Sequence, residues 1–238
     1  MSPKKLKPQY LGVIRREKRK SPPRVQPRFN ISRPGMVLLK GFVKPEDQIG
    51  MVSMCRQPGP GGFYEPSFKN GAKLNLWMMS LGKNWDPALR SYGPTRLFDG
   101  AQAPTIPDAF KMIAQTANST ASEFPQINPD VCIVNYYTNS GKLGLHQDKD
   151  ESKSSLAKGL PFISISIGDT AEFLFGDTRD KDQATKINLE SGDVLILGGE
   201  SRLLFHGVSH VKTNTAPSWL KEEMSIRPGR VNLTFRQY

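Results

Sequence analysis

One histidine of the sequence lies two residues before an aspartate, in the segment His146-Gln147-Asp148. If this segment is a strand, residues 146 and 148 point to the same face, so an imidazole nitrogen and a carboxylate oxygen can converge on one point. His206 or His210, from a distant strand, would add a second imidazole. Two histidines and one carboxylate bind iron(II) on one side and leave open positions for a co-substrate and oxygen. Alone, the His-x-Asp pair is more typical of a solvated turn than of a metal site.

Residues 230–236 alternate strictly between polar and apolar side chains, and the polar face carries Arg230, Asn232, Thr234 and Arg236. This period of two predicts a strand with two different faces. The alternative is an edge strand whose polar face meets water. In a β-rich domain, two inward-facing arginines are costly unless anions pair with them. A dicarboxylate such as 2-oxoglutarate offers one carboxylate to each arginine, and its keto-acid end can chelate iron.

Asn135 and Tyr137 form a second pair of polar side chains at positions i and i+2, in a run that begins with the apolar Val131. Ordinary strand alternation would also produce such a pair. Because a strand with two arginines accompanies them, we favour the interpretation that both side chains contact a ligand.

Several short segments follow one another in the second half of the sequence: 135–137 (NYY), 145–151 (LHQDKDE), 192–194 (GDV), 198–202 (GGESR), 205–207 (FHG) and 230–236 (RVNLTFR). This ordered set resembles the AlkB family, and its bacterial branch closely. Members of that family are iron(II)- and 2-oxoglutarate-dependent dioxygenases that demethylate alkylated bases in DNA or RNA. The match runs through residues 130–238, whereas residues 57–104 align poorly and the basic N-terminal tail has no counterpart.

The resemblance implies roles for the residues at matching positions. His146, Asp148 and His206 would bind iron, since His206, and not His210, has the Phe-His-Gly context. Iron(II), 2-oxoglutarate and O2 would be the cofactor and co-substrates. The residues implied to bind 2-oxoglutarate are Asn135, Tyr137, Arg230, Asn232 and Arg236.

The resemblance also implies contacts with the methylated base. Asp150 matches the position that contacts the exocyclic nitrogen of the target base. Trp85 and Tyr92 match aromatic residues that stack on the base or bind phosphate. A basic substrate contact is expected just after a Phe-Leu-Phe-Gly segment, and Arg179 is the candidate, although the position that matches by count is Asp180.

Strands must position most of these residues. From residue 130 onward we predict strands at 131–137, 143–146, 162–167, 171–175, 185–189, 193–197, 202–211 and 230–236. Many short strands with no helices between them predict an antiparallel barrel or a double-sheet jelly roll. Together with the resemblance, they predict an α+β, mainly β fold: a double-stranded β-helix (jelly roll) core with flanking N-terminal helices and a nucleotide-recognition lid.

The first half of the chain is expected to supply the helices and the lid. Residues 35–42 predict a strand, and Pro45 suits the first turn of a helix that runs to about Arg56. A second helix, with an apolar stripe, opens near Pro107 and ends before Phe124. Residues 57–104, rich in Gly, Pro and aromatic residues, are interpreted as nucleotide-recognition loops. Each aromatic ring alone would more simply close a small hydrophobic cluster.

The net charge of +11 is concentrated at one end of the 238-residue sequence. Residues 1–30 contain ten Lys or Arg and one acid, a net charge of +9, which leaves 11 − 9 = +2 for the rest. We therefore expect a basic, flexible tail over residues 1–34 and a single domain over residues 35–238, with the catalytic core at 130–238. The tail is either a tether for nucleic acid or a solvated or nuclear-targeting segment.

The sequence also bears on the compartment. No apolar run is long enough to span a membrane, and the N-terminus lacks the apolar region of a secretory signal. The two cysteines, Cys55 and Cys132, favour reduced thiols over a disulfide framework. We expect an intracellular monomer with no membrane partner. The nucleus is the favoured compartment, and the cytoplasm or an organelle is the alternative.

The predicted function is oxidative demethylation of 1-methyladenine, 3-methylcytosine or related lesions in DNA or RNA, which releases formaldehyde and succinate. A methyl group on the pairing edge is unreachable inside a duplex, so the base must flip out or already be single-stranded. One alternative keeps the chemistry and changes the target to 6-methyladenine, a protein or a small molecule. Another is a non-catalytic nucleic-acid binder, against which the full iron triad and both arginines argue.

Overall fold

The computed structural model describes residues 28–56, 61–68, 70–224 and 229–238. One sheet is made of β1 (Arg28–Arg33), β2 (Met36–Lys40), β3 (Trp77–Leu81), β6 (Val131–Tyr137), β8 (Phe162–Gly168), β11 (Val194–Leu197) and β13 (Arg230–Arg236). A second is made of β7 (Leu143–His146), β9 (Thr170–Gly176), β10 (Thr185–Leu189) and β12 (Phe205–Lys212). A hairpin is formed by β4 (Asn84–Asp86) and β5 (Ser91–Gly93). The α-helices are α1 (Pro45–Cys55), α2 (Asp108–Ala121), α3 (Lys153–Ala157) and α4 (Ser218–Met224).

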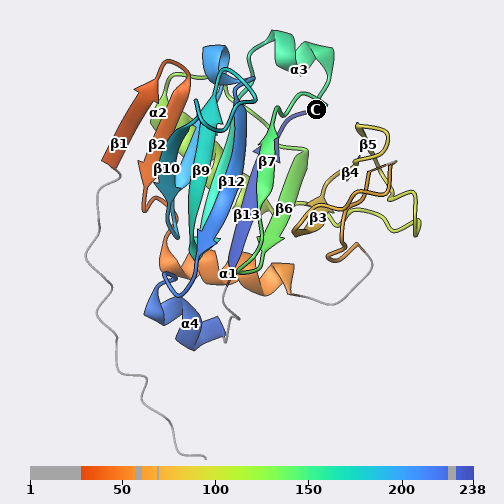
Figure 1. Cartoon of the computed structure of the whole chain (residues 1–238), viewed down its shortest axis with the longest axis horizontal. Helices are drawn as coiled ribbons and strands as arrows, with labels where there is room; N and C mark the ends of the chain where they lie inside the picture. Colours follow the sequence, from red (N-terminus) through yellow and green to blue (C-terminus); the bar gives the residue numbers. More distant parts are fainter. Residues whose placement is uncertain (1–27, 57–60, 69, 225–228) are drawn as a thin grey trace, which may run out of the picture.

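The two main sheets face each other, and the β4-β5 hairpin projects beside them (Figure 1). The larger sheet has the strand order β1-β2-β11-β8-β13-β6-β3, and the smaller sheet has the order β10-β9-β12-β7. Neighbouring strands in both sheets run antiparallel. This arrangement is a double-sheet jelly roll, which confirms the predicted fold class.

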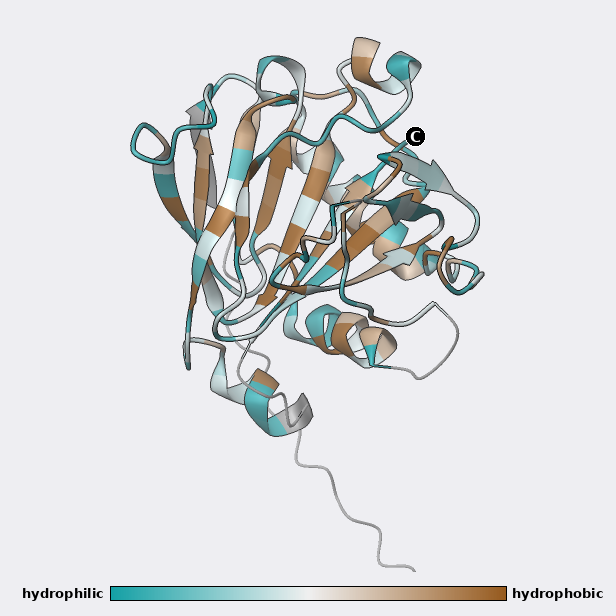
Figure 2. Ribbon diagram, turned by 45° about the vertical axis from the view of Figure 1, so that its right-hand side comes forward, coloured by the Kyte–Doolittle hydropathy of each residue, from teal (hydrophilic) through white to brown (hydrophobic). Residues whose placement is uncertain are grey.

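The larger sheet separates two hydrophobic clusters. On one side its apolar side chains pack against α1, α2 and α4, and on the other they meet the smaller sheet. In β13, Val231, Leu233 and Phe235 face the helices, whereas the polar residues line a pocket between the sheets. The predicted two-faced strand is therefore confirmed. Figure 2 shows brown apolar segments along the strands and teal segments in several connecting loops.

Most predicted elements lie where the sequence placed them. β6, β7, β10 and β13 have the predicted bounds, and α1 and α2 agree closely with the two predicted helices. The strand predicted at 202–211 is wrong at its start. A 3-10 turn, Gly199–Ser201, comes first, and the backbone N–H of Leu204 donates to the carbonyl of Ser201. β12 then begins only at Phe205.

The predicted boundary of the basic tail at residue 34 is also wrong. Residues Arg28–Arg33 form β1, which pairs antiparallel with β2 in the register Phe29↔Leu39 and Ile31↔Val37. Pairing satisfies the backbone groups of β2, which would otherwise be an open sheet edge. The alternation of Phe29 and Ile31 with polar residues was the signal in the sequence. The rest of the tail, residues 1–27, lies outside the described residues.

Several short helices and strands were not predicted from the sequence, because they contain too few residues for a hydrophobic period to be recognised. The expectation of no helices between the core strands is wrong, because α3 joins β7 to β8 and α4 joins β12 to β13. α3 has five residues and is capped by Ser152, whose hydroxyl accepts a hydrogen bond from the backbone N–H of Ser155 at 3.1 Å. Residues 57–104, expected as loops, contain β3, which pairs with β6, and the β4-β5 hairpin.

Two further expectations concern the cysteines and the membrane. Cys55 and Cys132 are both free and buried, so the structure contains no disulfide between them. None of the helices in the described ranges has the length and apolar character needed to cross a membrane.

Replacing Phe235 by Ala tests whether the apolar face of β13 packs in the hydrophobic cluster beside the helices. Its ring is 0% exposed in the helix-side cluster, so we expect the free energy of unfolding to fall by about 3–5 kcal/mol. Met112→Ala is the control, because Met112 on α2 is 62% exposed and its truncation should change stability by less than about 0.5 kcal/mol. Urea unfolding followed by circular dichroism measures both. Equal effects of the two substitutions would contradict this assignment of the core.

Candidate active site

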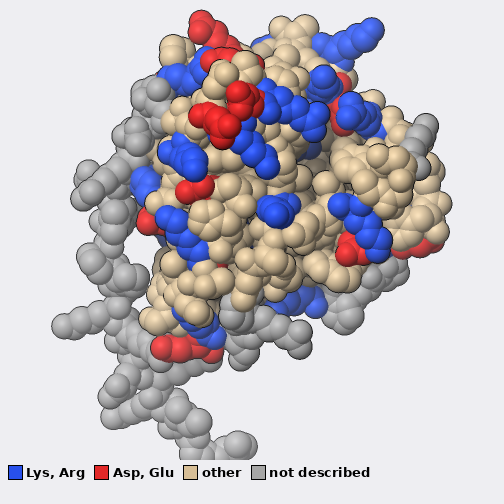
Figure 3. Space-filling model, in the orientation of Figure 1, with Lys and Arg blue, Asp and Glu red and all other residues tan. Residues whose placement is uncertain are grey.

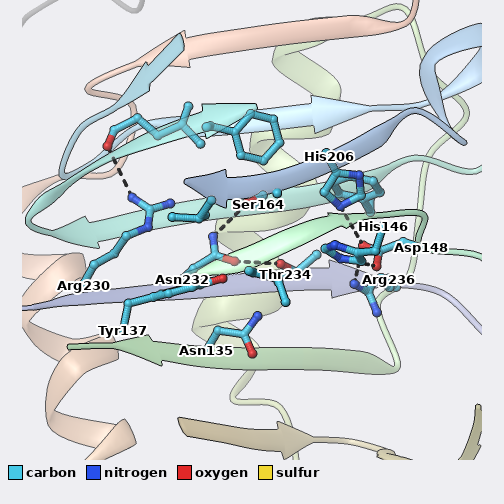
Figure 4. Close-up of a pocket in the computed structure, with 16 residues that line it drawn as sticks. Asn135, Tyr137, His146, Asp148, Ser164, His206, Arg230, Asn232, Thr234 and Arg236 are labelled. Carbon is cyan, nitrogen blue, oxygen red and sulfur yellow. Dashed lines mark hydrogen bonds and ion pairs between the residues drawn. The ribbon is translucent and has the colours of Figure 1, made fainter. Parts of the chain in front are cut away.

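The pairing of β7 with β12 brings the predicted iron ligands together. In this register His146 lies directly opposite His206. Asp148 lies between them, with its Oδ1 3.5 Å from His146 Nε2 and its Oδ2 3.5 Å from His206 Nε2. The three side chains each offer one ligand atom within 4.8 Å of the others, so they can hold one metal ion (Figure 4).

Backbone carbonyls fix both imidazole rings. His146 Nδ1 lies 2.9 Å from the carbonyl of Gly144, and His206 Nδ1 lies 3.0 Å from the carbonyl of Leu204. A carbonyl oxygen can only accept, so each Nδ1 carries the proton and donates. In the neutral imidazole that binds a metal, Nε2 then carries the lone pair, and both Nε2 atoms face Asp148 at the centre of the triad. This is the usual outer support of a histidine that binds a metal.

The glycine of the Phe-His-Gly segment has a steric role. A register shift separates His206 from Val208 in the pairing of β12 with β7, and Gly207 lies at this irregularity. A Cβ atom at Gly207 would lie 2.4 Å from the carbonyl oxygen of Leu143. Only glycine therefore allows the two histidine-bearing strands to approach this closely.

The charges of the triad suit a divalent metal. Burial by itself would raise the pKa of Asp148, but the guanidinium of Arg236 and the hydrogen bonds from both histidines outweigh it and hold this pKa well below the usual range. Burial lowers the pKa of His206, which favours its neutral form. For His146, burial lowers the pKa, but the hydrogen bond and the charge of Asp148 together with the Gly144 carbonyl outweigh burial, so the pKa is raised. One carboxylate and two imidazoles on one face are the donor set expected for iron(II).

A pocket between the two sheets contains all five residues that were predicted to bind 2-oxoglutarate: Asn135, Tyr137, Arg230, Asn232 and Arg236. It also contains the triad. Figure 4 shows the triad and Arg236 at one end, Arg230 at the other, and Asn232 and Thr234 between them. The structure therefore brings the predicted metal site and the predicted co-substrate residues into one cavity.

Arg230 is a buried cation without a carboxylate partner among the described residues. Its side chain is 2% exposed and donates to Ser166 Oγ at 2.8 Å and to the carbonyl of Leu189 at 3.3 Å. Its Nε has no hydrogen-bond partner within the described part of the chain. Burial lowers the pKa of Arg230 to about 10. A buried guanidinium in this condition fits a carboxylate supplied by a ligand.

Arg236 has a different environment. It donates to Asp148 Oδ2 and, at 2.6 Å, to the hydroxyl of Tyr92. Its Nε lies 3.3 Å from Glu151 Oε1. Arg236 already has anionic partners, so the expectation of one ligand carboxylate for each arginine suits Arg230 better than Arg236.

Polar side chains line the pocket between the two arginines. Asn232 donates to Ser164 Oγ at 2.7 Å, and Thr234 donates to Asn232 Oδ1 at 3.0 Å. Asn135 Oδ1 is buried and has no hydrogen-bond partner in the described residues. Burial raises the pKa of Tyr137 to about 12, so its hydroxyl stays protonated and can donate. These groups can orient a polar co-substrate.

Three of the four predicted base-contacting residues lie beside the triad. Trp85 and Tyr92 face each other across the β4-β5 hairpin. Trp85 Nε1 donates to Asp150 Oδ2 at 2.9 Å, and the Tyr92 hydroxyl accepts from Arg236. None of the four residues lines the pocket itself. Arg179 differs from the other three, because it is exposed in the connection between β9 and β10.

Sequence reasoning missed two buried residues behind the triad. Arg202 donates to the backbone carbonyl of Asp148 at 2.6 Å, and its Nη2 lies 2.9 Å from Glu151 Oε1. Both residues lie in segments that carried the family resemblance, at 198–202 and 145–151. No spacing rule predicts their contact, because it depends on how the loops at the ends of β7 and β12 meet.

Comparison with known proteins identifies the class. The sequence model of the 2OG-Fe(II) oxygenase superfamily matches residues 35–236, so the chain belongs to this superfamily. It is 42% identical over 215 residues to the alpha-ketoglutarate-dependent dioxygenase AlkB homolog of Caulobacter vibrioides (strain NA1000 / CB15N), across 86% of this chain and 88% of that protein. Within the superfamily, the chain is therefore a member of the AlkB family. The family's cofactor and co-substrates are iron(II), 2-oxoglutarate and O2, which the triad and its pocket fit.

Two further relatives are more similar in sequence. The chain is 51% identical over 249 residues to the DNA N(6)-methyladenine demethylase ALKBH1C of Arabidopsis thaliana, across 98% of this chain and 54% of that protein. The solved structure of OsALKBH1 matches with a TM-score of 0.86 and 56% identity, across 89% of this chain and all of that one. The chain spans about half the length of the Arabidopsis relatives it matches.

Replacing His146 by Ala tests the metal site directly. Removal of one of three ligands should abolish measurable binding of Co(II), used as an air-stable stand-in for iron(II), in calorimetry and visible absorption. His210→Ala is the matched control, since the His210 side chain lies on the same strand as His206 but is 51% exposed. The account fails if His210→Ala loses the metal and His146→Ala keeps it.

Proposed function

We propose that the protein is an iron(II)- and 2-oxoglutarate-dependent dioxygenase that demethylates N-methylated bases, of the 1-methyladenine and 3-methylcytosine type, in DNA or RNA. The observation that carries the proposal is the triad of His146, Asp148 and His206 in one pocket with the unpaired buried cation Arg230. Related proteins are named as demethylases of DNA or of tRNA. Nucleic acid is therefore the proposed substrate class.

The residues of the pocket would divide the work. When bound, iron(II), 2-oxoglutarate and O2 supply the oxidant that hydroxylates the methyl group, which then leaves as formaldehyde. Arg230 would hold the distal carboxylate of 2-oxoglutarate, and Asn135 and Tyr137 would orient the molecule. His146, Asp148 and His206 would hold the metal.

The β4-β5 hairpin would receive the base and act as the nucleotide-recognition lid. Extruding a base from a duplex costs a few kcal/mol, and a methylated base that cannot pair costs less. Stacking on an aromatic side chain recovers about 1–3 kcal/mol per base. Trp85 and Tyr92 would supply the aromatic rings, and Asp150, which accepts a hydrogen bond from Trp85, would accept one from an exocyclic amine.

A second candidate substrate is 6-methyladenine. The Arabidopsis relatives at 51% and 46% identity are both named DNA N(6)-methyladenine demethylases. The pocket chemistry is the same for both substrates, because the oxidant attacks an N-methyl group in each case. The two candidates differ in the nitrogen that carries the methyl group, a ring nitrogen in 1-methyladenine and 3-methylcytosine and the exocyclic nitrogen in 6-methyladenine. Because 6-methyladenine can still pair, its extrusion from a duplex should cost more.

An assay for formaldehyde on methylated oligonucleotides separates these candidates. We expect release that requires both iron(II) and 2-oxoglutarate, from DNA or RNA strands carrying 1-methyladenine, 3-methylcytosine or 6-methyladenine, each tested alone. His146→Ala should fall to background because it no longer binds the metal. If the wild-type protein releases no formaldehyde from any of these strands, the proposed substrate class is wrong. A protein or small-molecule target then becomes the better hypothesis.

Arg230→Met tests the co-substrate site. Removal of charge-assisted hydrogen bonds worth about 1.5–3 kcal/mol should raise the KM for 2-oxoglutarate by about 10- to 150-fold. Lys186→Met is the control, because the Lys186 side chain is 61% exposed on β10 and its replacement removes the same charge elsewhere. Unfolding temperatures of both variants show whether the fold is retained. An unchanged KM in a folded Arg230→Met protein would refute this role.

The basic tail is proposed as a nucleic-acid tether. On the face drawn in Figure 3, Lys and Arg are interspersed with Asp and Glu, whereas residues 1–27 hold nine Lys or Arg and one acid. A truncated chain that lacks residues 1–27 keeps β1. Its DNA affinity should depend less steeply on salt concentration. The slope of log affinity against log salt should become shallower by about 0.9 for each phosphate that the tail neutralises in the full chain. Turnover of short oligonucleotides should change little. An unchanged slope would instead favour a solvated or nuclear-targeting segment. The nucleus is proposed as the compartment on the basis of this basic tail.

A further inference from the structure

A network of two arginines and two carboxylates lies around Asp148, and two of its members were not predicted to bind the metal, the co-substrate or the base. These two members, Arg202 and Glu151, are 5% and 7% exposed. The other two are Arg236 and Asp148 itself. The network balances two positive and two negative charges within the buried part of the site, as buried charges require.

Arg202 holds the backbone of the metal-binding segment. Its Nη1 donates to the carbonyl of Asp148 at 2.6 Å, and its Nε donates to the carbonyl of Leu160 at 2.9 Å. Its guanidinium carbon lies 5.3 Å from the centre of the Phe162 ring. That ring in turn lies 5.2 Å from the ring of His206. Arg202 therefore contacts the main chain of one predicted metal ligand directly and supports a second through Phe162.

Glu151 connects this contact to the carboxylate end of Asp148. Its Oε1 lies 2.9 Å from Arg202 Nη2 and 3.3 Å from Arg236 Nε. Arg236 then donates to Asp148 Oδ2, next to the triad in Figure 4. The contacts form a closed circuit, because Arg202 donates to the main chain of Asp148, whereas Glu151 forms ion pairs with Arg202 and with the arginine that donates to the Asp148 side chain.

We propose that Arg202 and Glu151 are positioning residues that fix the direction of the Asp148 carboxylate toward the metal. The inference rests on the proposed function only in that the triad binds a metal. Both residues are buried and neither lines the pocket, so we assign neither of them a contact with the metal or with the co-substrate. Removal of outer supports of this kind typically changes metal affinity by about 10- to 100-fold.

A purely structural ion pair is the competing explanation. Removing one partner of a buried pair destabilises a protein because it leaves the other charge unpaired, whereas removing both partners is often neutral. If the two residues position Asp148, a double variant should therefore regain stability without regaining metal affinity. If the pair only stabilises the fold, both properties recover together.

The experiment compares Arg202→Met, Glu151→Gln and the double variant Arg202→Met/Glu151→Met in the full chain. Co(II) affinity is measured by calorimetry and the unfolding temperature by circular dichroism. We expect both single variants to lose stability and to bind Co(II) about 10- to 100-fold more weakly. The double variant should regain most of the unfolding temperature while its Co(II) affinity stays low.

Arg96→Met is the matched control. Arg96 is 9% exposed and forms an ion pair with Asp99 at 2.7 Å, outside the pocket. This variant should lose stability and keep wild-type Co(II) affinity. The inference is overturned if the double variant regains affinity together with stability, or if the single variants bind Co(II) as the wild type does. Failure of the wild type to bind Co(II) through His146 would instead overturn the proposed function.

Discussion

The antiparallel pairing of β7 with β12 is the constraint on which the site depends. It sets His146 opposite His206, although 60 residues separate them in the sequence. Gly207 permits the close approach of the strands, and backbone carbonyls turn both Nε2 atoms inward. Asp148, just beyond the end of β7, completes the triad. The rest of the jelly roll serves to hold these two strands against the polar face of β13.

The electrostatics of the pocket follow from this arrangement. Its metal end is rich in paired charge, since Asp148 is held ionised and Arg236 is held by Asp148, Tyr92 and Glu151. Its other end contains Arg230, buried and without a carboxylate partner in the described chain. A keto-diacid matches both ends, because one carboxylate and the keto group suit the metal and the other carboxylate suits Arg230. If the pocket binds such a molecule as proposed, its selectivity would depend on the difference between the two arginines.

Much of the fold and the site was predictable because it rests on local patterns. Strict alternation in residues 230–236 predicted both the strand and its two faces. The His-x-Asp spacing correctly predicted that the two side chains meet, although β7 ends at His146 and Asp148 lies outside the strand. β1 and the short helices α3 and α4 were not predicted, since edge pairing and five- to seven-residue helices leave little periodicity. The contacts of Arg202 with Asp148 and Glu151 depend on tertiary structure alone. The hydrogen bond from Trp85 to Asp150 is of the same kind.

Anomalous diffraction from crystals grown with Mn(II) and 2-oxoglutarate, without oxygen, tests the central claim most directly. The account predicts one strong manganese peak bounded by His146 Nε2, Asp148 and His206 Nε2. It also predicts electron density for 2-oxoglutarate that reaches from the metal to the guanidinium of Arg230. A peak at any other site, or a 2-oxoglutarate molecule that leaves Arg230 unpaired, would contradict the account.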